Sequence, residues 1–175
     1  MRPLYRLQQV WQGVVARPLS PAALHDIARH LSPAQMALFG RFSRSDQHHS
    51  YLVMATLRDA GCVEADLLTA ALLHDVGKTK VRFGLLARSW AAVVSKVSPA
   101  RAAVWGQLTW AQARPWQRPL IAYNQHPLWS AELAAEANTS PRALSLIRRH
   151  QEKLPHPQTA EDHLLRQLQW ADDQH

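Results

Sequence analysis

The sequence contains one cysteine, Cys62, in 175 residues. A lone thiol excludes an intrachain disulfide and excludes a metal site built from several thiolates. The first 20 residues lack the uninterrupted apolar centre of a signal peptide, because polar side chains break every apolar run. The same interruptions prevent this stretch from spanning a bilayer. We therefore expect a cytoplasmic protein whose length suits a single sizeable core.

Acidic residues are also scarce, with 13 Asp and Glu against 20 Lys and Arg, for a net charge of +7 and a pI near 10.3. This excess favours anionic partners such as phosphate esters, nucleic acid or an acidic membrane surface. Sixteen of the twenty basic residues are arginine, whose planar group suits bidentate phosphate binding. The charge alone does not select among these partners.

The alternating apolar pattern of β-strands is absent as well, so we predict an all-α architecture. A Ser-Pro pair occurs before four amphipathic segments, where serine can cap the free backbone N–H groups and proline can take the first helical position. These pairs begin at Ser20, Ser32, Ser98 and Ser140. Further helices are predicted over 4–15, 46–60, 63–76, 84–97, 128–138 and 160–174, and a loop over 153–158.

Several polar residues share a helix face with apolar ones. Helical periodicity places His49 in the apolar stripe of its helix, whereas His48 points away. His150 likewise faces inward. On the last helix Asp172 shares the apolar face and Asp173 does not. In each adjacent pair, one residue is therefore predicted to point into the core.

The helix predicted over 63–76 is apolar almost all round, which marks it as central, and it carries His74 and Asp75 in its last turn. A carboxylate there faces the negative end of the helix dipole and loses hydration, so a positive group should compensate it. These inward-facing histidines and aspartates lie on separate helices, and one divalent cation bound by all of them would explain why they face inward. Without a cysteine pair, these donors suit iron, manganese, zinc or a similar metal.

Three short segments resemble the HD superfamily of metal-dependent phosphohydrolases: DQHHS at 46–50, AALLHDVGK at 70–78 and WAD at 170–172. The resemblance implies a helical HD domain over 45–175, with 1–44 as a helical extension packed on its core. It implies that the metal ligands are His49, His74, Asp75 and Asp172. The earlier pair His25-Asp26 lacks the following Gly-Lys, so we interpret it as part of an ordinary amphipathic helix.

Two further segments resemble the HD-GYP branch, whose sites hold a second metal. Gln125-His126-Pro127 is similar to its His-Pro helix start, and Arg149-His150-Gln151-Glu152 is similar to its His-His-Glu-Arg segment. His126 and His150 are thus implied as additional ligands, unless His126 only caps a helix start. The stretch 153–157 departs from the Asp-Gly-x-Gly-Tyr-Pro stretch of that branch, which argues against cyclic dinucleotide hydrolysis.

The resemblance implies an enzyme that hydrolyses a nucleotide or another small phosphate ester with a metal-activated water. Asp75 and Lys78 are the catalytic residues it implies, and Lys78 would contact a substrate phosphate. A lysine after a helix-ending glycine can also be a solvated surface residue. The alternative function is a non-catalytic HD module that binds metal or nucleotide in signalling.

Residues 81–97 form a basic amphipathic segment that offers a third hypothesis, peripheral binding to an anionic membrane. Packing of its apolar stripe onto the core of the domain is the commoner use of such a helix. The stripe consists of Phe83, Leu86, Trp90, Val93, Val94 and Val97.

Tryptophans near arginines between 90 and 129 can stack on nucleobases, but without a nucleic-acid-binding motif we expect them to fill a core and line a pocket.

Overall fold

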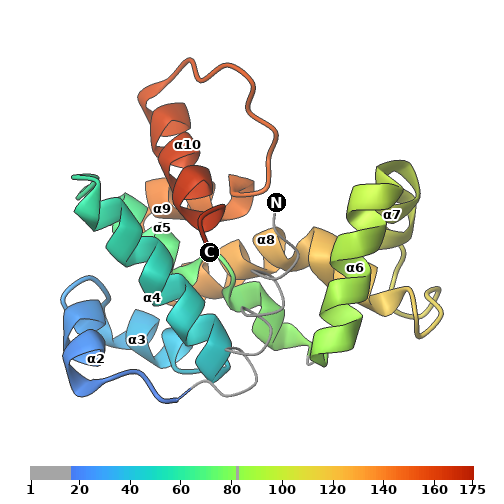
Figure 1. Cartoon of the computed structure of the whole chain (residues 1–175), viewed down its shortest axis with the longest axis horizontal. Helices are drawn as coiled ribbons and strands as arrows, with labels where there is room; N and C mark the ends of the chain where they lie inside the picture. The colour runs from blue at the N-terminus through green and yellow to red at the C-terminus, as the bar shows by residue number, and fades with distance from the viewer. Residues whose placement is uncertain (1–16, 82) are drawn as a thin grey trace.

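The computed structural model of the chain describes residues 17–81 and 83–175. The helix predicted over 4–15 lies outside these residues. The described residues form nine α-helices and one 3-10 helix and contain no strand, so the all-α prediction is confirmed (Figure 1). The elements are α2 (Pro21–Ala28), α3 (Pro33–Phe39), α4 (Arg44–Asp59), α5 (Ala65–Leu73), η1 (Val76–Lys80), α6 (Leu85–Val97), α7 (Pro99–Gly106), α8 (Arg118–Glu136), α9 (Pro141–Arg149) and α10 (Ala160–Asp172).

All four Ser-Pro pairs begin a helix, as predicted. Ser20, Ser32 and Ser140 each accept a hydrogen bond from a backbone N–H three residues later, so they cap α2, α3 and α9. Ser98 precedes α7 but makes no capping hydrogen bond. It also ends α6, and this shared position gives it φ −139° and ψ 67°, outside the usual cap conformation. The capping role predicted for Ser98 is therefore wrong.

The central helix ends earlier than predicted. It stops at Leu73, His74 is its C-cap, and Asp75 leads into η1. Gly77 directly follows the helix predicted over 63–76, which makes it the expected terminator, but it lies inside η1. A Cβ atom at Gly77 would come within 2.3 Å of the His126 carbonyl oxygen and 2.6 Å of the Ser130 nitrogen. The missing side chain thus lets η1 approach α8 closely, and the Gly77 N–H donates to Ser130 Oγ at 2.8 Å.

Helix α8 begins at Arg118, ten residues before the predicted start at 128, and contains Pro127. The prediction of a helix start at His126 is therefore wrong. Proline in a helix interior normally deprives the carbonyl four residues earlier of its donor. Here that carbonyl belongs to Tyr123, and it accepts a hydrogen bond from His126 Nδ1 at 2.7 Å. The histidine beside the proline thus replaces the missing backbone donor.

One large buried cluster fills the space between α2, α3, α4, α5, α8, α9 and α10. Helix α5 lies at its centre, as predicted, since all its residues from Leu67 to Leu73 except Thr69 are buried. Ile27 and Phe39, from the predicted N-terminal extension, belong to the same cluster. The domain boundary at residue 44 stays a prediction. We call the elements around this cluster, together with η1, the body.

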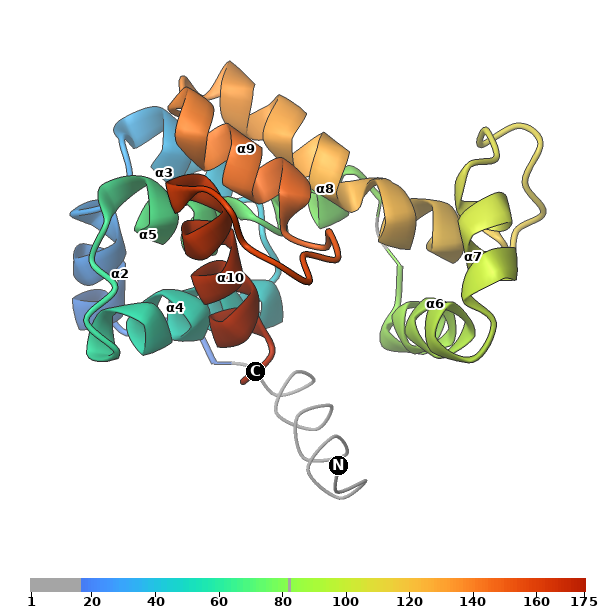
Figure 2. The same cartoon turned by 90° about the horizontal axis from the view of Figure 1, so that it is seen from above.

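A second, small cluster consists of Ala91, Val94, Ala102 and Leu120. It joins α6 and α7 to the first part of α8, at the end of α8 that lies away from α2 and α3 (Figures 1 and 2). We call residues 85–117 the arm. Of the apolar stripe predicted on this segment, Val94 is buried, but Leu86, Trp90, Val93 and Val97 are exposed. Core packing therefore accounts for only part of the stripe. Among the described residues, no helix combines the length and the apolar character needed to cross a membrane.

Candidate metal centre

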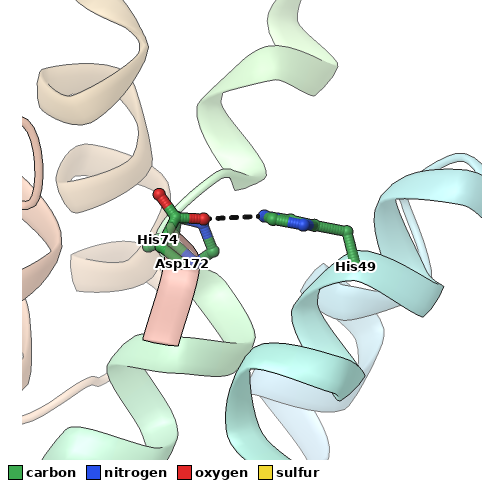
Figure 3. Close-up of side chains that lie close together, drawn as sticks. All are labelled: His49, His74 and Asp172. Carbon is green, nitrogen blue, oxygen red and sulfur yellow. Dashed lines mark ion pairs between the residues drawn. The ribbon is translucent and has the colours of Figure 1, made fainter. Parts of the chain in front are cut away.

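His49, His74 and Asp172 meet at the place where α4, the end of α5 and the end of α10 approach one another (Figure 3). Asp172 Oδ1 lies 2.9 Å from His49 Nε2 and 3.5 Å from His74 Nε2. The His74 side chain is 1% exposed, whereas those of His49 and Asp172 are 27% and 34% exposed. This group therefore has a buried side and a side open to solvent.

Asp75, His126 and His150 form a second group, which is fully buried. Asp75 Oδ1 lies 3.2 Å from His126 Nε2 and 3.9 Å from His150 Nε2. The Nε2 atoms of the two histidines are 3.2 Å apart. The three side chains come from the start of η1, the middle of α8 and the end of α9, so packing of these elements assembles the group.

The Asp75 carboxylate connects the two groups. Its Oδ1 faces His126 and His150, while its Oδ2 lies 3.5 Å from His74 Nε2 and 3.8 Å from His49 Nε2. All six residues predicted as metal ligands thus lie in one connected cluster: His49, His74, Asp75, His126, His150 and Asp172.

The neighbours His48 and Asp173 lie outside these groups, as helical periodicity predicts. His48 Nε2 is instead 2.7 Å from the Arg17 carbonyl oxygen, and Asp173 is exposed at the C-cap of α10. Each pair of adjacent residues thus supplies one member of the cluster and one side chain outside it. The half-buried His48 and the exposed Asp173 are matched controls for substitutions at His49 and Asp172.

The buried histidines are oriented by the backbone. In each of them Nδ1 lies within hydrogen-bond distance of a carbonyl oxygen three residues earlier, and because a carbonyl only accepts, Nδ1 must carry the proton. The lone pair of each neutral imidazole is then on Nε2, which faces the cluster. The acceptors are the carbonyl oxygens of Ala71 at 2.9 Å, Tyr123 at 2.7 Å and Ile147 at 2.7 Å.

This orientation directs the Nε2 electron pairs into the cluster, where not all of them meet a donor. His74 Nε2 is buried and has no hydrogen-bond partner. The Nε2 atoms of His126 and His150, 3.2 Å apart, direct two lone pairs at each other when both rings are neutral. Convergent imidazole lone pairs beside a carboxylate form the donor set that a divalent metal ion satisfies. The buried group of Asp75, His126 and His150 can therefore hold a metal ion, and so can the group of His49, His74 and Asp172.

The electrostatics of the cluster also draw positive charge to it. Burial favours a neutral His74, but the carboxylates of Asp75 and Asp172 outweigh burial and raise the pKa of His74 to about 9. Without a cation His74 therefore also carries a proton on Nε2, and a metal ion that binds this atom must displace that proton. Burial opposes the charge of Asp75 too, yet Lys78 and His74 hold the pKa of Asp75 well below its usual range. Burial lowers the pKa of His150 to about 3, and His74 acts in the same direction. The carboxylates thus stay ionised while His150 stays a neutral donor.

Lys78 lies in η1, and its ammonium contacts Asp75 Oδ2 directly. The lysine was predicted to follow a helix-ending glycine, but it extends from the 3-10 turn that packs on α8, and its side chain is 35% exposed. Burial opposes its charge, but Asp75 outweighs burial and raises the pKa of Lys78. A cavity of about 230 Å³ begins beside Lys78 and His126 and is otherwise lined mainly by apolar side chains of α6 and α8.

Two residues that the sequence did not single out support the cluster. Ser130 holds η1 on α8 through the Gly77 N–H, and Gln151 Nε2 lies 3.4 Å from His126 Nε2. Ser130 lies four residues after His126 on α8, a helical spacing that could have indicated it. Gln151 follows α9 in an irregular segment, where no periodicity orients a side chain.

Comparisons of the chain with protein-family models, with curated proteins and with solved structures found no match. The resemblance to the HD superfamily therefore stays a prediction based on the three segments that carry it.

Proposed function

We propose that this protein is a metal-dependent phosphohydrolase of the HD superfamily. The observation that supports it most is the position of Asp75, whose two oxygens face two separate pairs of histidines. A bound divalent cation supplies an activated water and neutralises phosphoryl charge, which are the main requirements of phosphate ester hydrolysis. One carboxylate between two donor groups is the arrangement expected of a site for two such cations.

Each residue of the cluster has a role in this proposal. His49, His74 and Asp172 would hold one cation, and Asp75, His126 and His150 would hold the other. The second oxygen of Asp75 lies toward the first group. Imidazole and carboxylate donors without a thiolate suit iron, manganese or another transition metal better than calcium. The half-exposed side of the first group provides access for water and substrate.

Lys78 and Asp75 have the two further catalytic roles in this proposal, which are phosphate binding and placement of the attacking water. The Lys78 ammonium, kept charged by its neighbour, binds a substrate phosphate and compensates the charge that develops on it. Asp75 would position the attacking water through its place between the two groups. The substrate is a nucleotide or another small phosphate ester in the cytoplasm, and its organic part fits the apolar cavity that begins beside Lys78 and His126.

The decisive experiment combines metal analysis with a substrate screen. The protein is purified without oxygen, its iron, manganese and zinc are quantified, and it is assayed with phosphomonoesters, phosphodiesters and nucleotides in the presence of manganese, iron(II), cobalt or nickel. His49→Ala, Asp75→Ala and Asp172→Ala are expected to lose both metal and activity. Their adjacent controls, His48→Ala and Asp173→Ala, should retain both. Unchanged metal content in the first three variants would refute the proposal.

The contact between Lys78 and Asp75 favours a second candidate function, a non-catalytic module that binds metal or nucleotide in signalling. A lysine already compensates the carboxylate there, so Asp75 does not require a second cation to stay ionised. This candidate predicts tight binding of a nucleotide or phosphate ester with no release of product. The same screen separates the two functions when binding is measured alongside turnover.

A further inference from the structure

Four apolar side chains on α6 form a continuous stripe on the outside of the arm. Leu86, Trp90, Val93 and Val97 follow one another at helical spacing and are 87%, 45%, 56% and 79% exposed. The buried residues Ala91 and Val94 lie on a neighbouring face of the same helix. The stripe is therefore not the face that holds α6 on α8. Contiguous apolar side chains exposed in this way mark an interaction surface.

The charge around this stripe has one sign. Between Asp75 and Glu132 the sequence has no acidic residue but has eight basic ones. Lys96 and Arg101 are both exposed, on α6 and α7. The basic residues of the arm itself are Arg88, Lys96, Arg101 and Arg114. Lys78 and Lys80 lie on η1, where they pair with Asp75 and Glu132. Because the arm has no carboxylate of its own, a negatively charged surface is complementary to it.

Tryptophan is concentrated at the same place. Trp90 belongs to the stripe, and its indole N–H donates to the Trp116 carbonyl oxygen at 3.2 Å, which holds the segment after α7 beside α6. Trp110 and Trp116 are themselves 41% and 42% exposed. Tryptophan is enriched where an apolar interior meets a polar surface, as at the headgroup level of a bilayer.

We propose that the arm docks on an anionic lipid bilayer, with the stripe of α6 inserted at the headgroup boundary and the surrounding lysine and arginine side chains against lipid phosphates. Apolar side chains, tryptophans and basic residues on one amphipathic helix are the combination that such a surface binds. A second copy of the chain fits less well, because two acid-free arms repel each other. Nucleic acid fits less well because exposed leucine and valine do not stack on bases.

The test is cosedimentation of the full chain with vesicles. We expect binding to vesicles of equal parts phosphatidylcholine and phosphatidylglycerol, no binding to phosphatidylcholine alone, and weaker binding as salt is added. The double variant Val93→Asp, Val97→Asp should reduce the partition coefficient by at least about tenfold. Lys96→Gln should reduce it roughly fivefold, because a basic residue near such a surface contributes to binding.

Val63→Asp is the matched control, since Val63 is 64% exposed but precedes α5 on the body. It should bind vesicles like the unchanged protein, and thermal unfolding verifies that all variants fold. The proposal is overturned by absent binding, by equal binding to both kinds of vesicle, or by an equal loss in the control. It is also overturned if the double variant instead abolishes a dimer in sedimentation velocity or binding to an oligonucleotide. None of these readouts depends on phosphohydrolase activity.

Discussion

The body and the arm use the same kinds of residue in opposite ways, although both pack against α8. The body buries most of its leucines in one large cluster and encloses ionisable side chains beside it. The arm buries little, and it exposes leucine, valine and tryptophan beside basic side chains. A large core can hold imidazoles and carboxylates at fixed distances, whereas a small cluster only holds a surface in place. The two proposals accordingly place the chemistry in the body and the docking surface on the arm.

The strongest way to test this comparison is to truncate one leucine in each region. Leu72 is completely buried on α5, while Leu86 is 87% exposed on α6. Leu72→Ala should lower the free energy of unfolding by about 2–5 kcal/mol because it leaves a cavity. Leu86→Ala should change it by no more than about 0.5 kcal/mol. Urea denaturation followed by circular dichroism measures both, and similar losses in the two variants would contradict the division.

Removing the lysine at the cluster separates catalysis from folding. Lys78→Gln should lower the rate of phosphate ester hydrolysis by roughly 10²–10³, as removal of a group that stabilises transition-state charge does. Metal content should be retained, because Lys78 is not among the donors. Lys80→Gln is the control, since Lys80 pairs with Glu132 at the exposed side of η1. Equal rates of hydrolysis in the two variants would show that Lys78 does not take part in catalysis.

A methyl group at Gly77 tests the contact between η1 and α8. Its Cβ would collide with backbone atoms of His126 and Ser130, so Gly77→Ala should cost about 1–3 kcal/mol of stability and displace Asp75. Gly84→Ala meets no atom within 4 Å and should be nearly neutral. Thermal unfolding and metal content measure the two effects. If Gly77→Ala had the melting temperature and metal content of the unchanged protein, the close approach of η1 to α8 would not be needed for stability or for metal binding.

The smallest effect is expected from a pH-dependent ion pair that joins α9 to α10. Asp162 Oδ1 accepts from Arg149 Nη2 at 2.8 Å, and this bond holds the pKa of Asp162 below its ordinary value. A depressed pKa means that the pair stabilises the fold above the unfolded pKa of about 3.9 and loses this effect as the pH falls further. Asp162→Asn should therefore lower the melting temperature at pH 7, and the difference should shrink below about pH 4. Glu136→Gln, at an exposed carboxylate, should show no such trend.

Periodicity and spacing predicted much of this molecule. The four Ser-Pro helix starts, the central position of α5 and the inward direction of His49, His150 and Asp172 follow from rules that act within one helix. These rules also distinguish His49 from His48, because neighbouring residues on a helix point in different directions.

Interactions between helices could not be predicted in this way. Gly77 resembles a helix terminator, and only the approach of α8 shows why it lacks a side chain. Pro127 resembles a helix start, but His126 replaces the backbone donor that proline lacks, so α8 continues through it. The exposed stripe on α6 has the periodicity of a buried one, but the small cluster packs against the neighbouring face of α6 and leaves the stripe exposed.

The most direct test of the central claim is anomalous X-ray diffraction from crystals of the metal-loaded protein. We expect two anomalous peaks, one among His49, His74 and Asp172 and the other between His126 and His150, with the Asp75 carboxylate next to both. Anomalous peaks elsewhere, or none beside these six side chains in protein that carries metal by elemental analysis, would contradict the account.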